Sequence, residues 1–379
     1  MLCTRSPNKR STVLLLSLAL MLVYILTYDV IYPFDYRSSP GIGQYLEEMT
    51  KDAHSDDRNQ KCSNSCSQCT FYPVSGIAKD IGFPCVQTST RPSTMVCIFD
   101  EWSDMYISHD ILYTGIWEPK VVKDFQEVLS KTHGSGVVDL GANIGFYTLI
   151  ASKMGHKVIA VEPHRESIYR LHRALYIEGL GDNVYVLENG ISDKRGDAVL
   201  RLSGNNQGDH RIRENPRPCS GKHCLPVIRT ILLDDLCTVI GGNFSSVILK
   251  MDIQGYEHRA FRHAAVLFGS YNIDYIFMEW FLMAGHYVNS SHMSEDKILV
   301  QQMLAFLFGH DFRPYSLTAD GGGPLDPAKW HLWPFDIIWI RLPDDVEKTT
   351  ILSSHFRNWP PWSSVDIRTY RNMQGILCV

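Results

Sequence analysis

The segment Val137-Val-Asp-Leu-Gly-Ala-Asn-Ile-Gly145 decides the fold of this chain. Its first four residues predict a short buried strand, and the residues from Phe146 to Met154, which precede Gly155, predict a helix. Glycines between a strand and a helix permit a tight turn and let the backbone approach a ligand closely. The spacing is not the GxGxxG of a dinucleotide site, so a nicotinamide oxidoreductase is disfavoured.

The residues after this segment alternate between strand and helix patterns. Apolar runs predict strands at 157–161, 184–187, 247–251 and 275–278, helical spacing predicts helices at 166–177, 257–268 and 294–309, and 312–317 with 335–340 predict a closing antiparallel pair. This alternation predicts an α/β fold, a Rossmann-like, doubly wound, mainly parallel sheet with a closing antiparallel strand. In such a sheet the ligand crevice lies at the carboxyl ends of the strands.

Several residues at this edge are candidates for binding a nucleoside cofactor. Asp139 offers a carboxylate to a cationic amino group. Glu162 ends the second strand, 21 residues after Gly141, where an acid can accept hydrogen bonds from both ribose hydroxyls. Asn189 follows the third strand and is placed to approach an adenine, with a role in a turn as the alternative. The cofactor-binding candidates are Asp139, Gly141, Asn143, Gly145, Glu162 and Asn189.

The segment Val138-Asp-Leu-Gly-Ala-Asn-Ile-Gly-Phe-Tyr-Thr148, with Val161-Glu-Pro163, resembles the FkbM-type family of class I methyltransferases. Gly115-Ile-Trp-Glu118 and Leu249-Lys-Met-Asp-Ile-Gln-Gly-Tyr-Glu257 resemble further blocks of that family, and the resemblance covers roughly residues 98–342. It implies a class I fold, S-adenosylmethionine as cofactor and methyl transfer, usually to a hydroxyl oxygen. One departure matters: the family pattern usually reads Asp-x-Glu-Gly-x-Glu, and Gln254 replaces the first Glu.

Three carboxylates are the catalytic candidates. Asp252, at the end of the 247–251 strand, is expected to orient the acceptor or to act as a general base. Glu279 ends the next strand on the same sheet edge, where a salt bridge is the alternative to a site role. Glu257 either takes part in the site or caps the helix that it begins, because a helix N-terminus favours negative charge.

Three further residues lie beside these candidates in the sequence. Trp117 and Glu118 can close over the cofactor, although packing is the preferred interpretation of Trp117. His164 is interpreted as a surface or ribose-side residue rather than as a base. No spacing of histidines indicates a zinc site, and no metal is expected.

The N-terminus predicts a membrane anchor. Basic residues precede an uncharged run of 18 residues, Ser11 to Tyr28, which just spans a hydrocarbon core of ~30 Å at about 1.5 Å per residue. The positive-inside rule then places the rest of the chain across the membrane; a cleaved signal peptide is the alternative. The predicted organisation is a cytosolic tail (1–10), an anchor (11–28), a luminal stem with a cysteine-rich loop segment (29–97), the methyltransferase domain (98–342) and a C-terminal extension (343–379).

The ten cysteines agree with an oxidising compartment. Cys62, Cys66 and Cys69 have the spacing of a radical iron–sulfur site, but a luminal segment favours disulfides instead. The sequons at Asn243 and Asn289 are compatible with glycosylation. The polar loop 203–224 is read as a solvated insertion rather than as a contact for an anionic acceptor.

These observations predict a single-pass type II membrane enzyme of the endoplasmic reticulum or Golgi that methylates a hydroxyl of a small molecule or a glycan. The net charge of −5 gives no attraction to nucleic acid. A catalytically inactive methyltransferase fold that serves as a binding or scaffold module is the alternative, motivated by Gln254. We expect Gly141→Val or Glu162→Ala to abolish cofactor binding and to leave the fold largely intact.

Overall fold

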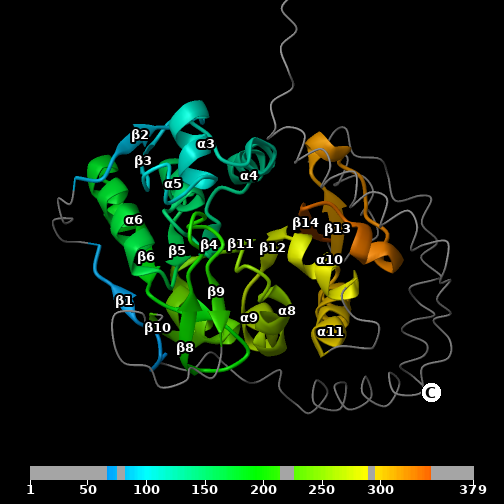
Figure 1. Ribbon diagram of the computed structural model, residues 1–379. Helices are drawn as coiled ribbons and strands as arrows, with labels where there is room; N and C mark the ends of the chain where they lie inside the picture. Colours follow the sequence, from blue (N-terminus) through cyan, green and yellow to red (C-terminus); the bar gives the residue numbers. More distant parts are fainter. Residues whose placement is uncertain (1–65, 75–81, 214–225, 289–294, 343–379) are drawn as a thin grey trace, which may run out of the picture. The chain divides into compact units, whose positions relative to one another are not determined.

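An eight-stranded sheet forms the centre of the computed structural model, which describes residues 66–74, 82–213, 226–288 and 295–342 (Figure 1). All described residues belong to one unit of the chain, Arg58–Val365, and the other unit, 1–57 with 366–379, lies outside them. The strands follow the order β1-β6-β5-β4-β11-β12-β14-β13. They are β1 (Phe71–Tyr72), β4 (Gly136–Leu140), β5 (Val158–Val161), β6 (Val184–Leu187), β11 (Val247–Met251), β12 (Ile273–Glu279), β13 (Phe312–Ser316) and β14 (Asp336–Arg341).

The sheet is mainly parallel, as the sequence predicts. Strands β6, β5, β4, β11 and β12 run parallel to one another, β14 is antiparallel to β12, and β13 is antiparallel to β14. The doubly wound sheet with a closing antiparallel strand is therefore confirmed. Its five parallel strands end along one edge, which positions the residues that follow them close together.

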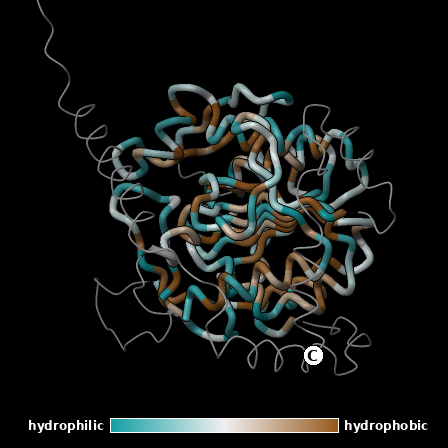
Figure 2. The backbone as a smooth tube through the Cα atoms, turned by 90° about the vertical axis from the view of Figure 1, so that its right-hand side faces the viewer, coloured by the Kyte–Doolittle hydropathy of each residue, from teal (hydrophilic) through white to brown (hydrophobic). Residues whose placement is uncertain are grey.

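Helices cover both faces of the sheet, which Figure 1 shows above and below the strands. One core cluster joins α3 to α6 with alternate strand residues such as Val137, and a second joins α7, α8, α9 and α11 with the intervening ones such as Val138. Apolar positions recur along the central strands (Figure 2). The helices are α3 (Ile107–Thr114), α4 (Pro119–Lys131), α5 (Phe146–Lys153), α6 (Arg165–Glu178), α7 (Leu236–Ile240), α8 (Glu257–Ala260), α9 (Ala265–Ser270), α10 (Phe281–Val288) and α11 (Glu295–Gly309).

Two smaller sheets flank the central one. A four-stranded sheet has the order β7-β10-β8-β9, and β2 pairs with β3 in an antiparallel hairpin. The part of the loop 203–224 that is described contributes β9 to the four-stranded sheet, so it is not only a solvated insertion. The strands are β2 (Cys85–Gln87), β3 (Met95–Cys97), β7 (Gly190–Ile191), β8 (Gly196–Arg201), β9 (Arg211–Arg213) and β10 (Val227–Ile231).

Two sequence expectations need correction here. The segment 61–97 is not simply a disulfide-tied loop, because β1 pairs with β6 and extends the central sheet, and Val96 and Cys97 are buried in its core. The helix expected at 257–268 is divided into α8, a short 3-10 turn and α9. Asp234 accepts a hydrogen bond of 2.9 Å from the backbone N–H of Leu267, so a side chain distant in sequence binds an N–H in the first turn of α9.

Some expectations lie outside the described residues. These are the anchor at 11–28, the stem up to residue 65, the sequon at Asn289 and the extension 343–379. Within the described ranges, no helix combines the length and the apolar character that a membrane span requires.

Candidate functional site

The glycine turn joins β4 to α5 in a left-handed backbone conformation. Gly141 has φ 80°, Asn143 φ 49° and Gly145 φ 86°. The N–H groups of Gly141 and Ala142 both donate to the carbonyl of Val161, at 2.9 and 3.1 Å, so the turn is fixed to the end of β5. A turn of this shape presents backbone groups at the carboxyl edge of the sheet, where a nucleoside is expected.

Gly141 is required by a neighbouring backbone. A β-carbon at this position would lie 1.8 Å from the carbonyl oxygen of Asp252. The turn therefore packs directly against the residues that follow β11, and the backbone N–H of Asp252 donates to the carbonyl of Leu140 at 3.0 Å. This contact contradicts the expectation that Gly141→Val leaves the fold largely intact.

Glu162 points toward the glycine turn. Its two carboxylate oxygens accept hydrogen bonds from the backbone N–H groups of Asn143, at 2.8 Å, and His164, at 2.7 Å. Each carboxylate oxygen can accept a further bond, so both remain able to take a ribose hydroxyl. Burial raises the pKa of Glu162 to about 7. Removing this carboxylate would leave two backbone donors unpaired, so Glu162→Ala also affects the fold.

Asp139 and Asn143 are two further cofactor-binding candidates at the glycine turn. Asp139 is buried and accepts a hydrogen bond of 2.6 Å from the hydroxyl of Thr148, and burial raises its pKa to about 6. The amide oxygen of Asn143 accepts a bond from Ser167, while its buried amide nitrogen has no hydrogen-bond partner among the described protein atoms. The amide nitrogen of Asn143 can donate a hydrogen bond to a ligand, and the carboxylate of Glu162 can accept further ones. These two groups fit a ligand that carries hydroxyl and carboxylate groups.

Strand register brings together Asp252 and Glu279, which are called the acceptor-side carboxylates below. Lys250 pairs with Asp139 across β11 and β4, and two positions further on Glu279 pairs with Asp336 across β12 and β14. The ammonium of Lys250 lies 3.6 Å from a carboxylate oxygen of Asp252. Burial and neighbouring carboxylates raise the pKa of Glu279 to about 10 and that of Asp336 to about 7. Among the residues described, no group of three or more His, Cys, Asp or Glu side chains is arranged to hold a metal ion.

Glu118 joins the same group from the start of α4. Its backbone has φ 46°, and its carboxylate accepts a hydrogen bond of 2.6 Å from the hydroxyl of Tyr147. Burial raises the pKa of Glu118, and the charge of Lys250 opposes that shift. Trp117 packs against the hydrophobic core, as preferred from the sequence.

Backbone strain is concentrated at this edge. Four non-glycine residues in the described ranges have positive φ, and three of them are Glu118, Asn143 and Gln254. Left-handed backbone is unfavourable for such residues and persists where the surrounding structure enforces it, often at functional sites. All three residues lie within the quoted sequence motifs, so the backbone conformation and the motifs point to the same edge.

Glu257 orders the loop after β11. It is fully buried, and one carboxylate oxygen accepts a hydrogen bond of 2.9 Å from the backbone N–H of Ile253. Burial raises its pKa to about 7. The structure shows the contact that caps the loop, while the other carboxylate oxygen is buried without a hydrogen-bond partner among the described atoms, so the role of Glu257 in the site stays a prediction.

Asn189 is not available to a cofactor through its side-chain amide. The amide oxygen accepts a bond of 2.7 Å from the N–H of Thr70, and the amide nitrogen donates to the carbonyls of Gln68 and Arg229, both at 3.1 Å. The side chain is fully buried. The prediction that Asn189 approaches the adenine is therefore not supported, and its role is to connect β1 and β10 to the end of β6.

His164 is not a surface residue. It is 8 % exposed, stacks on Phe99 and contacts the ring of His210 edge-on. Burial lowers its pKa to about 3, so it is neutral at physiological pH. It lies on the ribose side of the site because its N–H binds Glu162.

Neither Asp336 nor Lys250 is among the site residues predicted from the sequence. The signal for Lys250 was present: a lysine inside the apolar run 247–251 must be buried with β11 and needs anionic partners. Asp336 carries no local signal, because only the antiparallel pairing of β14 with β12 places it beside Glu279.

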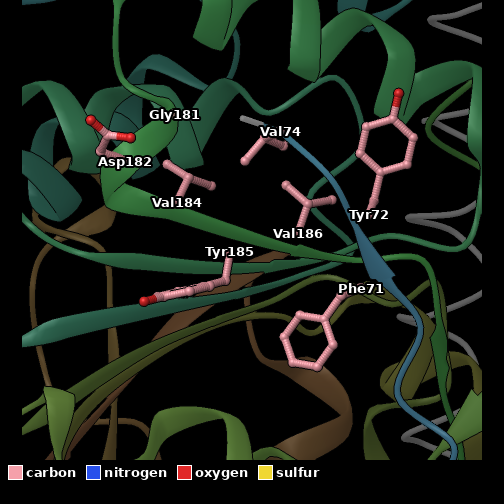
Figure 3. Close-up of a pocket in the computed structure, with 8 residues that line it drawn as sticks. All are labelled: Phe71, Tyr72, Val74, Gly181, Asp182, Val184, Tyr185 and Val186. Carbon is pink, nitrogen blue, oxygen red and sulfur yellow. The ribbon is translucent and has the colours of Figure 1, made fainter. Parts of the chain in front are cut away.

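A cavity of about 310 Å³ lies away from this edge. It is lined by β1, the start of β6 and the turn before it, and the side chains of Val74, Val184 and Val186 gather there (Figure 3). Because Val184 begins β6 and the candidate residues follow the ends of the strands, this cavity is separate from the candidate site.

Comparison with known proteins gives one family and several weak structural likenesses. Residues 139–314 match the model of the methyltransferase FkbM domain. Curated protein sequences give no match. Similar solved structures include an rRNA methylase from Streptococcus thermophilus (11 % identity, TM-score 0.33, 60 % of this chain and 99 % of that chain).

Two more solved structures show likeness of the same order. One is a putative methyltransferase from Streptococcus mutans in complex with SAH (10 % identity, TM-score 0.34, 60 % of this chain and 100 % of that chain). The other is a SAM-dependent O-methyltransferase from Thermotoga maritima (12 % identity, TM-score 0.29, 61 % of this chain and 68 % of that chain). Similarities this weak assign no activity.

The family match covers the glycine turn, Glu162, Asp252 and Glu279. It confirms the resemblance seen in the sequence and, with it, S-adenosylmethionine as the expected cofactor. Over residues 139–314, this chain therefore matches the FkbM family of methyltransferase domains.

Proposed function

We propose that this domain transfers a methyl group from S-adenosylmethionine to a hydroxyl oxygen. The observation that carries the proposal is the contact between Gly141 and the carbonyl of Asp252. It joins the glycine turn to the acceptor-side carboxylates at one edge of the sheet. The family match supports the reaction class. The hydroxyl acceptor is supported by the carboxylates, which accept hydrogen bonds from such a group.

The cofactor supplies a methyl group activated by the positive charge of its sulfonium. Glu162 would accept hydrogen bonds from the ribose hydroxyls, and the amide nitrogen of Asn143, which has no partner among the described atoms, would donate to the ligand. The protein's part in the reaction is then to position the acceptor and to remove its proton. Asp252 is the group for this task, because its side chain is 24 % exposed and lies next to the turn.

Glu279 has a different role from Asp252. With a pKa raised to about 10, it carries its proton at neutral pH and donates a hydrogen bond. Asp252 as acceptor and the protonated Glu279 as donor can hold a hydroxyl from both directions. The alternative of an inactive scaffold rests on Gln254, whose amide retains hydrogen bonds to both carboxyls, so the structure favours an active enzyme.

We also propose that the domain acts in the lumen of the secretory pathway, anchored through residues 11–28. Every cysteine in the described ranges is disulfide-bonded: Cys66 with Cys69, Cys85 with Cys97, and Cys237 as well. Such use of cysteine is typical of oxidising compartments and leaves no free thiolates at Cys66 and Cys69 for an iron–sulfur cluster. A glycan acceptor follows from this compartment alone.

The test is transfer of a labelled methyl group by the purified full chain to separated fractions of neutral glycans, anionic glycans, lipids, proteins and RNA. We expect labelling of a neutral hydroxyl-bearing fraction that depends on Asp252 and is lost in Asp252→Ala. Transfer of the labelled methyl group to the RNA fraction would instead identify RNA as the acceptor class. Absence of S-adenosylhomocysteine binding by calorimetry would favour the scaffold alternative. Protease protection of the chain in sealed microsomes tests the luminal orientation.

A further inference from the structure

Gln254 bridges the two acceptor-side carboxyls. Its amide nitrogen donates to Oδ1 of Asp252 at 2.7 Å and to Oε2 of Glu279 at 3.4 Å. The first is a short hydrogen bond to a carboxylate, and the second is a long one. A Gln side chain carries two N–H donors on this nitrogen, so it can bind both carboxyls at once.

The backbone enforces this placement. Gln254 has φ 55° and is followed by Gly255 with φ 91°, which makes two successive left-handed residues. The conformation suits Gly or Asn better than Gln, so the hydrogen bonds of the Gln254 side chain offset the cost of this backbone. Glu257 holds the loop by accepting a bond from the N–H of Ile253.

The charges around Asp252 require a neutral donor at position 254. Oδ1 of Asp252 binds the amide of Gln254, and Oδ2 faces the ammonium of Lys250 at 3.6 Å, so both oxygens are fixed. The titratable groups near Asp252 come from every element packed around it: Lys250 on β11, Asp139 on β4, Tyr147 on α5, Glu162 after β5, Glu279 on β12, Asp336 on β14, Glu118 before α4 and Glu257 on α8. Among these groups Lys250 is the single cation. An additional carboxylate at position 254 would repel Asp252 and Glu279.

We propose that Gln254 is a positioning residue that holds Asp252 beside Glu279 in the orientation that binds the acceptor hydroxyl. This inference rests on the proposed function. It also explains the departure from the family pattern: the amide replaces an acid without removing the contact between the two strand ends.

The decisive variants are Gln254→Leu, which removes the hydrogen bonds, and Gln254→Glu, which restores the residue usual in the family. Both keep the left-handed position occupied by a side chain of similar length. Gln126→Leu is the matched control, because Gln126 is half-buried and its amide donates to the carbonyl of Arg91, far along the chain from Gln254. All variants are expected to keep the S-adenosylhomocysteine affinity of the wild type.

We expect Gln254→Leu to lower kcat by about 10- to 100-fold on the glycan fraction labelled by the wild type, at every pH. Gln254→Glu is expected to be impaired at pH 8 and to recover toward wild type as the pH falls to 6, because a protonated Glu can donate to Asp252 and an ionised one repels it. Wild-type kcat in Gln254→Leu, or a Gln254→Glu more active than wild type at pH 8, would overturn the proposal.

Crystal structures of wild type and Gln254→Leu at one pH give a readout that needs no acceptor. We expect the carboxyls of Asp252 and Glu279 to separate and Asp252 to change rotamer in the variant. Unchanged carboxyl positions would overturn the positioning role even if the wild type transferred no methyl group. If the wild type transfers no methyl group but the two carboxyls separate in Gln254→Leu, the result would count against the proposed function alone.

Discussion

Glu279 and Asp336 face each other across the antiparallel strands β12 and β14, so two carboxyls lie in register at one end of the sheet. Burial, and after it the neighbouring carboxylates, raise the pKa of Glu279 from 4.5 to about 10 and that of Asp336 from 3.8 to about 7. The folded state therefore binds these protons more tightly than the unfolded state. The contribution of this pair to the free energy of unfolding therefore falls as the pH rises from the pKa values of the unfolded state to those of the folded state.

Glu279→Gln should remove most of this pH dependence. At pH 4 to 5 the protonated Glu279 resembles Gln, so the melting temperatures of variant and wild type should be similar. By pH 8 the variant should melt higher, by on the order of 5 °C. Calorimetry from pH 5 to 9 measures this, with Glu166→Gln, a carboxylate 57 % exposed, as the control. A difference that stays constant across the range would contradict the shifted pKa.

Gly141→Ala should destabilise the fold as well as the site. The residue has φ 80°, and the added β-carbon would collide with the backbone of Asp252, which is not a flexible side chain. We expect a loss of about 3 kcal/mol or more. Gly155→Ala is the matched control, because Gly155 has φ 91° and nothing lies within 4 Å of its β-carbon position. It should lose only about 1 kcal/mol. Equal losses by chemical denaturation would show that the collision with Asp252 is absent.

Asn189→Ala tests the corrected role of Asn189. The substitution leaves the N–H of Thr70 and two backbone carbonyls without their partner, at a cost of about 2–3 kcal/mol. Affinity for S-adenosylhomocysteine should change less than twofold at a temperature where the variant is folded. A large loss of affinity in a stably folded variant would restore the predicted contact with the adenine.

The central strands could be predicted from the sequence because each is a continuous apolar run. β6 and β11 have the predicted bounds, and all five residues of β11 are buried, since helices cover both faces of a parallel sheet. The glycine turn and the position of Glu162 beside it were predictable for a similar reason, because the motif, the strand end and the acid lie within one strand–helix–strand unit.

The remaining features depend on contacts between distant residues. Strand β1 has two residues and exists because it pairs with β6, more than a hundred positions later. Helix α9 starts where Asp234 binds the N–H of Leu267, which no local pattern reveals. Asp336 reaches Glu279 only through the register of β14. In each case the partner is separated in sequence, so neither periodicity nor composition carries the information.

Cofactor affinity should rise with pH through the ionisation of Glu162. Its pKa is raised to about 7 by burial, and only the ionised form offers both oxygens to the ribose hydroxyls. Methylthioadenosine is the suitable probe, because it carries the ribose without the titratable amino-acid part of S-adenosylmethionine. His164 does not interfere, since its pKa is lowered to about 3 and it stays neutral in this range.

We expect the affinity of the wild type for methylthioadenosine to increase about tenfold between pH 6 and pH 8. Glu162→Gln should bind weakly and without this pH dependence, while Glu166→Gln should follow the wild type. Calorimetric titrations at pH 6, 7 and 8 measure both effects. An affinity that is independent of pH in the wild type, or a Glu162→Gln variant that binds as tightly as the wild type at pH 8, would show that this carboxylate does not bind the ribose.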